Sequence, residues 1–406
     1  MHIAVFYQYY HNPDCAATGR HYTFIKHWSE RHQVTLITTN TWRGQRLTRR
    51  FDWVPPGVRL LELDVAYANA MTVPQRLFAF GRYALGALRH GLTIPKPDVI
   101  FGTSTPLSAA WIAGQVARLR GVPWVFEVRD LWPDFPIQMG AVTNGWLQRR
   151  LYAAERRLYQ SAAHVVPLSP DMERHVRAQG IPPERITMLF NGTDLDLAAQ
   201  ATEADVRHLR RQFGLGDRRV VLYAGTFGRA NDLPTLITAA ERLAHRGDLC
   251  FVFAGDGYYL DTLRSAEARL PNVRVLPPQP RHGAFALFKL AELALVPFLG
   301  LPVLAANSPA KFFDSLAVGT PVLVTNPGWT KAFVEEHRCG WFVPASCPDV
   351  LAQWIDDLFG RPGALVEAGA HGQAVAERTF GRVEQARTLE DLFQRVVGNG
   401  TAGTPT

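Results

Sequence analysis

The sequence predicts an α/β protein of two domains, each built on a doubly wound parallel sheet. The chain has 406 residues, 47% of them apolar and 19% charged, which is an ordinary globular composition and long for a single core. A strand, a polar loop, a helix and a second strand follow one another at the N-terminus, and the same order returns from residue 220. In sheets of this kind, ligands bind beyond the carboxyl ends of the strands.

The first predicted domain, residues 1–193, opens with an apolar strand at residues 2–7, the loop HNPDCAATG and a helix at residues 20–31. The further strands expected in this domain span residues 34–38, 58–63, 98–102, 124–128, 164–166 and 185–189. The loops that follow strands, and are therefore expected to line a ligand site, begin near Gln8, Gly102, Arg129, Ser169 and Asn191.

The second predicted domain, residues 194–378, repeats this organisation after a polar stretch. Its expected strands span residues 220–224, 250–254, 273–276, 293–296 and 321–325. Glycine-rich turns follow the first two strands, at residues 225–229 and 255–257. A final helix is predicted at residues 379–397, and the sequence GNGTAGTPT predicts a disordered tail at residues 398–406.

Residues 308–324, SPAKFFDSLAVGTPVLV, are predicted to form a helix that leads into a buried strand. Ser308 is a suitable N-cap and Pro309 suits the first helical position, because a helix leaves its first N–H groups unpaired. Lys311 then falls in the first turn, where the helix dipole favours an anion over a cation. A lysine at this place is favourable if a phosphate also binds at the helix N-terminus.

Asp314 lies one turn after Lys311 and allows two interpretations. Its carboxylate can accept hydrogen bonds from sugar hydroxyls beside a bound phosphate, or it can form a surface ion pair with Lys311 at i,i+3. The cationic helix start and the two glycine-rich turns all follow strands of one domain. Together they favour a pocket for a diphosphate flanked by a base and a sugar.

The net charge of +7 is unevenly distributed, since residues 1–190 carry 22 Lys and Arg against 13 Asp and Glu. No nucleic-acid-binding motif is present, so we expect this basic half to face an anionic membrane and not nucleic acid. Residues 71–94 read as a basic amphipathic helix, and residues 146–159 add four arginines. The alternative is a helix that packs on its own domain with its arginines in water.

The cysteines are scattered (Cys15, Cys250, Cys339 and Cys347), which predicts free thiols in a reducing compartment and no metal site. The N-terminus MHIAVFYQ lacks the basic region of a signal peptide. The most apolar window, residues 287–306, contains charged residues and prolines and does not suit a membrane span. We therefore expect a cytoplasmic protein that can bind the inner face of the plasma membrane.

Several motifs are spread over nearly the whole chain: QYYHNPDCAATGRHYTFIKHW, FEVRDLWPD, NGTD, YAGTFGRANDLPTLITAA, FAGDG and NSPAKFFDSLAVGTPVLV. With them the sequence resembles the family-4 retaining glycosyltransferases of the GT-B fold, in the bacterial branch that builds surface polysaccharides. The SPxK and RDLWP forms are similar to those of N-acetyl-fucosamine-type transferases. The resemblance implies two Rossmann-like domains facing a cleft, with the final helix crossing back to the first domain.

The resemblance also implies roles for individual residues in donor binding. Lys311 and Arg229 would contact the diphosphate, and Asp314 would bind the ribose hydroxyls. Gly255 and the backbone at residues 278–279 would border the nucleobase. The candidate donor-binding set is completed by Gly228, Gln279 and Ser308.

In the first domain, the resemblance implies that the loop ending at Gly19 approaches the diphosphate and the acceptor. Asp130 matches the Asp of the family's His-Asp pair and is, with Arg229 and Lys311, a candidate catalytic residue. Glu127 is a further candidate polar residue of this site. Arg129 stands where the family has the His, so it is counted as substrate-binding and the role of that His cannot be carried over.

The motif at residues 306–314 departs from the family as well. Ala306 replaces the first acid of the family's E-x7-E motif, which normally contacts the donor sugar, and Asp314 replaces the second Glu. The donor sugar therefore cannot be transferred from the family to this chain. Asn231 and Asp232 also stand where a Lys is common in the first glycine-rich turn.

These observations predict a retaining hexosyltransferase that moves a sugar from a nucleotide-diphosphate sugar, expected to be a UDP-sugar, without a metal or other cofactor. The acceptor implied by the resemblance is a glycan or a polyprenyl-diphosphate-linked glycan in O-antigen, capsule or exopolysaccharide synthesis. Two alternatives remain open. One is a non-catalytic nucleotide-sugar-binding subunit of a polysaccharide assembly complex, and the other is a sugar-nucleotide epimerase of the same fold.

Overall fold

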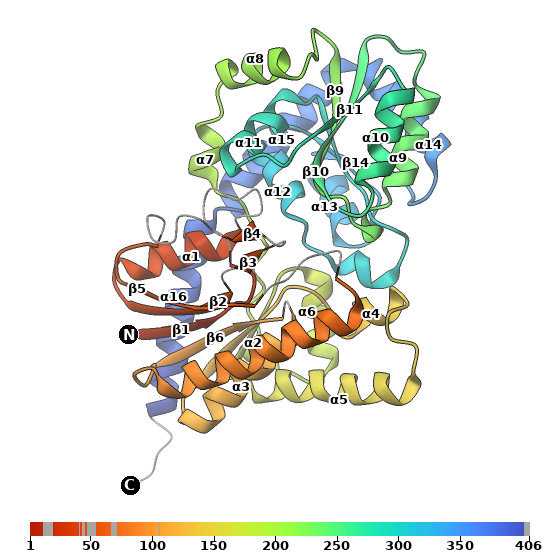
Figure 1. The fold of residues 1–406 in the computed structure, drawn as a ribbon. Coiled ribbons are helices and arrows are strands. Elements are labelled where there is room, and N and C mark those ends of the chain that lie inside the picture. The colour runs from red at the N-terminus through yellow and green to blue at the C-terminus, as the bar shows by residue number, and fades with distance from the viewer. Residues whose placement is uncertain are drawn as a thin grey trace. The chain divides into compact units, whose positions relative to one another are not determined.

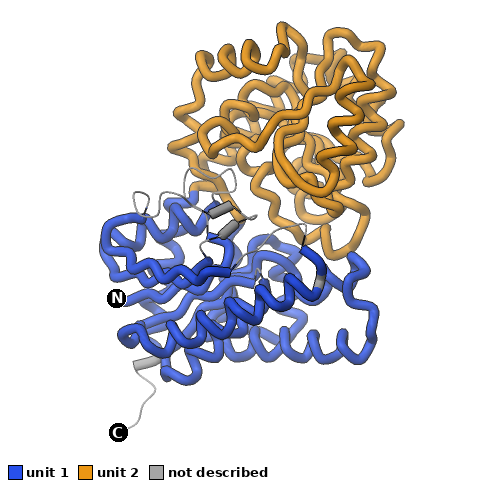
Figure 2. Tube along the Cα trace, in the orientation of Figure 1, with its two compact units in different colours: residues 1–13, 18–190, 382–406 blue, residues 14–17, 191–381 orange. Residues whose placement is uncertain are grey.

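The computed structural model describes residues 1–10, 19–39, 41–42, 45–46, 54–65, 71–104 and 106–401 (Figure 1). The described residues form two compact units (Figure 2). Unit 1 contains the described residues up to Phe190 together with those from Arg382 onward, and unit 2 contains residues 191–381. Within the described residues, the chain thus passes between the units after Phe190 and after Gly381. The predicted boundaries were residues 193 and 378.

Unit 1 contains a parallel sheet of order β5-β2-β1-β6-β7-β8. Its strands are β1 (His2–Phe6), β2 (Gln33–Thr39), β5 (Val58–Leu63), β6 (Val99–Thr103), β7 (Trp124–Val128) and β8 (His164–Pro167); β3 (Thr41–Trp42) and β4 (Gln45–Arg46) form a small separate ribbon. Strands β1, β6 and β7 are buried on both faces, as near-continuous apolar runs require in a sheet covered by helices. The central strand β1 lies between β2 and β6, where the direction of winding reverses.

The helices of unit 1 are α1 (Arg20–Ser29), α2 (Val73–Thr93), α3 (Leu107–Arg120), α4 (Asp134–Gln138), α5 (Gly145–Ser161), α6 (Pro170–Ala178) and α16 (Arg382–Thr401), with a short 3-10 turn η1 (Pro183–Arg185). The strand predicted at residues 185–189 is not part of the sheet. Pro182 and Pro183 start a turn, and the residues after it donate two backbone hydrogen bonds to β8 without forming a ladder.

The C-terminal helix α16 belongs to unit 1, although it follows unit 2 in the sequence. It packs against α1, where the Trp28 indole N–H donates to the carbonyl of Ala386 at 2.9 Å and its ring lies 5.1 Å from that of Phe393. The helix continues to Thr401, so the tail predicted from residue 398 starts too early; residues 402–406 lie outside the described residues.

Unit 2 repeats the architecture with a parallel sheet of order β11-β10-β9-β12-β13-β14. Its strands are β9 (Arg219–Thr226), β10 (Leu249–Asp256), β11 (Val273–Leu276), β12 (Leu293–Val296), β13 (Val322–Val324) and β14 (Gly340–Phe342). Strand β14 was not predicted, because its partly exposed residues Gly340–Phe342 do not form an apolar run like that of β13. Cys250, Cys339 and Cys347 carry free thiols, and Cys15 lies outside the described residues.

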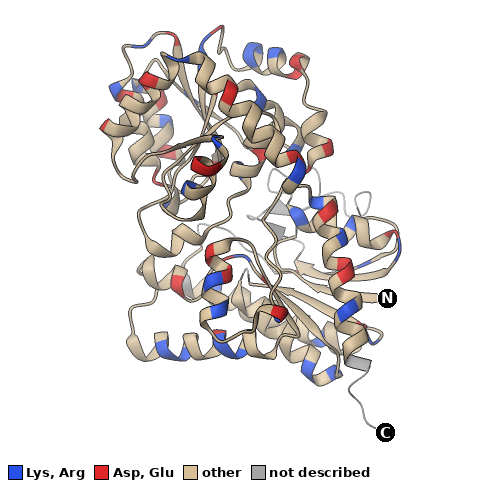
Figure 3. Ribbon diagram, turned by 180° about the vertical axis from the view of Figure 1, so that it is seen from behind, with Lys and Arg blue, Asp and Glu red and all other residues tan. Residues whose placement is uncertain are grey.

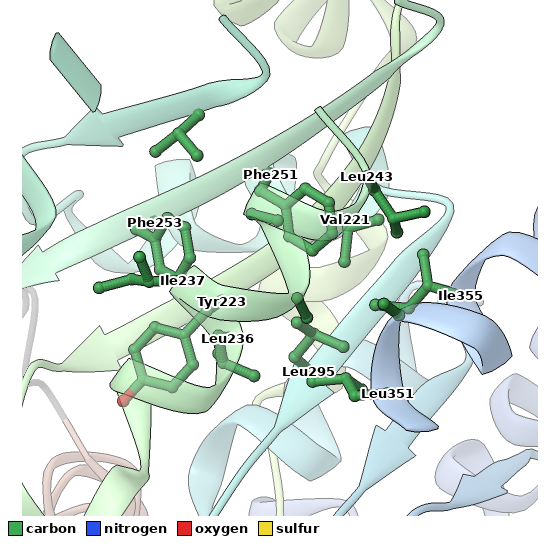
Figure 4. Packing of buried hydrophobic residues seen from close by; sticks show 14 of the residues in the cluster. Val221, Tyr223, Leu236, Ile237, Leu243, Phe251, Phe253, Leu295, Leu351 and Ile355 are labelled. Carbon is green, nitrogen blue, oxygen red and sulfur yellow. The ribbon is translucent and has the colours of Figure 1, made fainter. Parts of the chain in front are cut away.

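The helices of unit 2 are α7 (Leu195–Ala199), α8 (Glu203–Gln212), α9 (Leu233–Arg242), α10 (Leu260–Arg269), α11 (Arg281–Leu290), α12 (Ala310–Ala317), α13 (Trp329–His337), α14 (Pro348–Phe359) and α15 (Pro362–Thr379), with 3-10 turns η2 (Arg229–Asn231) and η3 (Pro302–Ala306). Part of its core is built from β9, β10, α9 and α14, where aromatic and branched side chains such as Phe251, Leu236 and Ile355 interlock (Figure 4). This close packing holds the carboxyl ends of β9 and β10 in place.

Candidate functional site

The carboxyl edge of the unit 2 sheet carries most of the predicted donor-binding residues. Strand β9 lies between β10 and β12, so the winding reverses at β9. In sheets of this kind the crevice at this reversal is the usual ligand site. The chain leaves β12 through η3 and then enters α12, which brings Lys311 back to the end of β9.

Lys311 lies over the aromatic face of Tyr223, with its ammonium 3.9 Å from the ring centroid. Tyr223 and Gly225 are two residues apart on β9 and therefore face the same side of the sheet. A Cβ at Gly225 would lie 3.2 Å from Lys311 Cε, so the glycine leaves room for the lysine to reach the strand end. The sequence analysis did not identify Tyr223, although its position two residues before the glycine-rich turn was a usable signal.

The electrostatic environment of Lys311 favours binding of an anion. Its side chain is half-buried, and burial lowers the pKa of the ammonium to about 7. Among the described residues, the ammonium makes no ion pair, and it packs against the Tyr223 ring. A phosphate bound at this place would supply the negative charge that Lys311 lacks among the described residues.

Gly255 and Gly257 fix the neighbouring turn because no other residue fits their positions. Gly255 has φ +156° and pairs with Gly225 in the β9–β10 ladder, where an added Cβ would lie 1.9 Å from the Gly225 carbonyl oxygen. Gly257 has φ +144°, and a Cβ there would lie 3.0 Å from the Phe227 backbone. The two glycine-rich turns therefore stack backbone against backbone at the strand ends.

Arg229 and Gly228 form the start of η2, just beyond the end of β9. The Arg229 side chain is exposed, and its guanidinium carbon lies 4.1 Å from the ring centroid of Tyr258, which is itself 62% exposed. Stacking on Tyr258 restricts the guanidinium while leaving its N–H groups open to solvent. Arg229 is thus a second cation at the same edge of the sheet.

Ser308 does not cap α12 as predicted, because the helix begins at Ala310 with Pro309 in the N-cap position. The Ser308 hydroxyl instead accepts a hydrogen bond from the Asn191 backbone N–H at 3.3 Å, and the Asn191 side-chain amide donates to the Ser308 carbonyl at 3.0 Å. Because the helix begins two residues after Ser308, the serine hydroxyl accepts from the loop that begins unit 2 and not from a helix N–H.

Asp314 is 3% exposed and is paired neither with Lys311 nor with solvent. Its carboxylate accepts two hydrogen bonds from the Arg281 guanidinium, at 2.5 and 2.7 Å, and one from the Thr193 hydroxyl at 2.7 Å. Arg281 also donates to Asp194 at 3.0 Å. The surface Lys–Asp pair is therefore wrong, and ribose hydroxyls would have to compete with these bonds to reach Asp314.

Gln279, the candidate at the nucleobase, follows β11 in a loop rich in proline. Its side-chain amide donates to the Pro277 carbonyl at 2.9 Å, which fixes the side chain within its own loop. The amide oxygen remains as an acceptor in this half-buried position.

In unit 1, Arg129 and Asp130 follow β7 at the carboxyl edge of the other sheet. Ser104, at the end of β6, accepts hydrogen bonds from the backbone N–H groups of Arg129 and Asp130 at 2.8 and 3.3 Å. The Arg129 guanidinium donates to the Tyr7 hydroxyl at 2.7 Å. Gly19 is the N-cap of α1 in extended backbone, and the rest of its predicted loop, residues 11–18, lies outside the described residues.

At this edge, Glu127 belongs to a buried cluster of charged and polar side chains with Arg20 and His21. The sequence analysis identified Glu127 but not the other two residues. The Glu127 carboxylate is fully buried between the His21 imidazole, at 2.7 Å, and the Arg20 guanidinium, at 3.3 Å. Burial by itself raises the pKa of Glu127, but His21 and Arg20 outweigh it and lower the pKa to about 2. Burial lowers the pKa of His21 to about 4, so this imidazole is neutral and donates one N–H to Glu127.

The sequence did carry a signal for Arg20, since a cation in the first turn of α1 opposes the helix dipole, as Lys311 does in α12. Arg281 carries the same signal as the first residue of α11, whereas none points to Thr193. Their partner Asp314 lies far away in sequence, and only the fold brings the three side chains together.

Two Rossmann-like sheets with helices on both faces, one of them with a cationic, glycine-lined carboxyl edge, define a GT-B protein. Residues 22–192 match the family described as Glycosyl transferase 4-like domain, and residues 218–361 match Glycosyl transferases group 1. These two matches cover more than three quarters of the chain, which therefore belongs to the glycosyltransferases of this type.

Individual relatives agree with this assignment at low sequence identity. The WcaI protein of Escherichia coli (strain K12), named as a glycosyl transferase of colanic acid biosynthesis, is 28% identical over 58% of this chain and 59% of its own length. The chain thus spans less than two thirds of that relative. Anabaena HepE, crystallised with UDP and glucose, aligns with a TM-score of 0.71 and 17% identity, covering 97% of this chain and 100% of that one.

WaaG, a glycosyltransferase involved in lipopolysaccharide biosynthesis, aligns with a TM-score of 0.65 and 16% identity over 95% of this chain and 98% of its own. Similarity at this level establishes the GT-B fold. The narrower resemblance to N-acetyl-fucosamine-type transferases stays a prediction.

Proposed function

We propose that this glycosyltransferase moves a sugar, with retention of anomeric configuration, from a UDP-sugar to a glycan or polyprenyl-diphosphate-linked glycan in the synthesis of a bacterial surface polysaccharide. The observation that carries the proposal is the half-buried ammonium of Lys311, which lies against the glycine edge of β9 without an ion-pair partner among the described residues. The polysaccharide context is supported by the names of WcaI and WaaG, and the choice of UDP by the HepE complex.

In this reaction the bond between the anomeric carbon and the diphosphate breaks, and negative charge grows on the leaving diphosphate. Lys311 and Arg229 are the cations at the unit 2 edge that would stabilise this charge, and we assign that role to them and not to a metal ion. The acceptor oxygen attacks the anomeric carbon from the same face, and its proton passes to an oxygen of the departing diphosphate. Asp130 is proposed as a polar site residue of unit 1. No covalent sugar–enzyme intermediate is part of the proposal.

The test is thermal unfolding of the purified protein with a panel of UDP-, GDP-, dTDP- and ADP-sugars. We expect a selective rise of Tm with a UDP-sugar, because a ligand at a hundred times its Kd adds about 2.7 kcal/mol of stability. The stabilising donor is then incubated with polyprenyl-diphosphate-linked glycans, and release of the nucleoside diphosphate is measured. Binding without release for any acceptor would favour the non-catalytic subunit. Conversion of the donor into an altered sugar nucleotide, with no acceptor and no net release of nucleoside diphosphate, would favour the epimerase.

Donor binding should depend on pH through Lys311. The free ammonium has its pKa lowered to about 7 by burial, and a bound diphosphate would raise it again. Above pH 7 the free lysine is therefore mostly neutral, and binding must take up a proton. We expect the affinity for UDP-glucose to fall up to about tenfold per pH unit between pH 7 and the pKa of the complex.

Calorimetric titration in buffers of different ionisation enthalpy measures this proton uptake directly. At pH 8.5 the wild-type protein should take up a substantial fraction of one proton for each UDP-glucose bound, and Lys311→Met should take up none. Equal proton uptake in both proteins would assign the titrating group elsewhere.

We further propose that α2 of unit 1 docks on an anionic membrane surface. Its small residues Ala79 and Ala87 face inward together with Tyr83, while Leu77, Phe78 and Leu85 are 63%, 69% and 72% exposed. Exposed large apolar side chains beside arginines are typical of an interfacial helix. Within the described residues, none of the helices combines the length and apolarity that a membrane-crossing segment needs.

Arginines of α2 and α5 add positive charge to unit 1 (Figure 3). Arg82 and Arg89 on α2 are exposed, and Arg76 is half-buried. The four arginines of α5 are all exposed: Arg149, Arg150, Arg156 and Arg157. Each arginine near an anionic bilayer contributes about 1 kcal/mol to binding.

Replacement of Arg76, Arg82 and Arg89 by Ala should weaken binding to phosphatidylglycerol-containing vesicles by about 100-fold, as three charges imply. Co-sedimentation with the vesicles measures the effect. The matched control replaces three exposed arginines of unit 2, Arg207, Arg211 and Arg378, which removes the same charge. If the two triple variants bind equally, α2 is not the docking surface.

A further inference from the structure

Among the described residues, the segments at residues 190–191 and 381–382 connect the units, and they are joined to each other inside unit 2. Thr193, just after the first passage, donates its backbone N–H to the carbonyl of Phe380 at 2.8 Å, just before the second passage. Thr193 and Gly381 also form an isolated parallel bridge. A single point in unit 2 therefore holds both connections.

Helix α12 is attached to this point through its side chains. The Asp314 carboxylate accepts the Thr193 hydroxyl at 2.7 Å, and the Phe313 ring packs edge-on against Phe380 with centroids 4.7 Å apart. Ser308, two residues before the helix, binds Asn191 through two hydrogen bonds. The same helix carries Lys311, one turn before Asp314, so a rigid helix connects the anion site to both passages.

Arg281 completes this arrangement, which we call the crossing network (Thr193, Asp194, Arg281 and Asp314). Its guanidinium binds Asp314 through two hydrogen bonds and Asp194 through a third. Burial lowers the pKa of Arg281, but the two carboxylates outweigh it and raise the pKa above its usual value. Arg281 is 7% exposed and Thr193 is fully buried.

Buried ionic networks contribute little net stability compared with apolar residues of the same volume, and their best-supported role is to fix one geometry. Arginine suits this role because its planar fork sets the direction of each bond. Stability alone therefore does not explain why α12 is tied to the passages by charges.

We propose that the crossing network is a positioning device, in which Asp314 fixes the helix that carries Lys311 to the two chain passages between the units. Asp314 is then a positioning residue and not a ribose ligand. This inference rests on the proposed function in one respect, namely that Lys311 binds the donor diphosphate. If the proposal holds, a donor bound to Lys311 keeps a fixed position relative to the segments at residues 190–193 and 380–382.

The test removes one hydroxyl from the network and compares the effect with that of removing a buried hydroxyl outside the network. Thr193→Val deletes the bond to Asp314 with little change of shape, and Thr193→Ser restores it. The matched control is Thr320→Val, because the Thr320 hydroxyl is equally buried and donates to the Phe288 carbonyl at 2.6 Å, at the amino end of β13.

The first measurement is amide hydrogen exchange of the ligand-free proteins, which requires no activity. Thr193→Val should raise exchange in residues 310–317 and 379–382 above that of Thr320→Val, and Thr193→Ser should match the wild type. If Thr193→Val and Thr320→Val exchange alike in these segments, the network does not hold α12 to the passages and the proposal is overturned.

The second measurement separates kcat from binding of UDP. Thr193→Val should lower kcat for nucleoside diphosphate release by about 10- to 100-fold, as small misplacements of reactants do, while the Kd for UDP stays within about threefold. A Kd that rises in parallel with the loss of kcat would make the network part of the nucleotide pocket and refute the positioning role. A wild-type protein that binds no UDP would refute the choice of UDP in the proposed function, and the exchange data would still decide on the network.

Discussion

Lys311→Met should abolish most of the affinity for the donor without destabilising the free protein. Loss of a charged contact to the diphosphate costs about 1.5–3 kcal/mol, so the Kd for UDP should rise about 10- to 150-fold. The free protein should keep its Tm or gain stability, because burial disfavours the ammonium and methionine fills a similar volume against Tyr223. Calorimetric titration and thermal unfolding measure the two effects.

The matched control for this prediction is Lys331→Met on α13. Lys331 also lies over an aromatic ring, that of Phe342 at 4.6 Å, but it is 38% exposed and faces Glu335 at 3.9 Å. Its replacement should leave the Kd for UDP unchanged. A wild-type Kd in Lys311→Met would remove the diphosphate role from Lys311 and with it the central support for a nucleotide-sugar site at this edge.

Arg20→Met should destabilise unit 1 by about 3–5 kcal/mol, since it leaves the buried Glu127 carboxylate without its arginine. The variant also loses the hydrogen bond from Arg20 to the Phe190 carbonyl, 2.7 Å away, next to the first chain passage. For a unit of this size, such a loss corresponds to a fall in Tm of about 10 °C. Denaturant unfolding gives the free energy, and a thermal melt gives the shift.

Arg31→Met provides the comparison, because Arg31 follows the same helix, is 69% exposed and approaches Glu390 only to 3.9 Å. The free energy of unfolding of Arg31→Met should differ from that of the wild type by no more than about 0.5 kcal/mol. Equal stability of the two variants would mean that Glu127 is satisfied without Arg20, and the cluster would then have no strong role in holding the edge of the unit 1 sheet.

Local patterns in the sequence predicted most strands of both sheets, although β14 was missed and residues 185–189 form no strand of the sheet. Buried parallel strands such as residues 124–128 and 293–296 are continuous apolar runs, and the structure places strands there with the same bounds. The glycine-rich turns at Gly225 and Gly255 lie at adjacent strand ends because parallel strands all end at the same edge. Lys311 stood out from its position alone, since a cation at a helix start opposes the dipole.

The partners of the polar side chains could not be predicted in this way. Ser308 was assigned to a helix cap, but the helix begins later and the serine binds Asn191. Asp314 was assigned to ribose or to Lys311, but Arg281 and Thr193 occupy its carboxylate. Each of these bonds joins residues separated by tens of positions or more in the chain.

The orientation of α2 was likewise decided by packing. Its sequence predicts a basic amphipathic helix and leaves open which of its residues pack on unit 1, and the structure exposes Leu77 and Leu85 while Ala79 and Ala87 are buried. Sequence by itself thus determined where strands, turns and helices form, because those depend on neighbours within one or two turns. Only the tertiary structure decided which charges pair and which apolar side chains stay exposed, because these depend on surfaces that meet after the chain has folded.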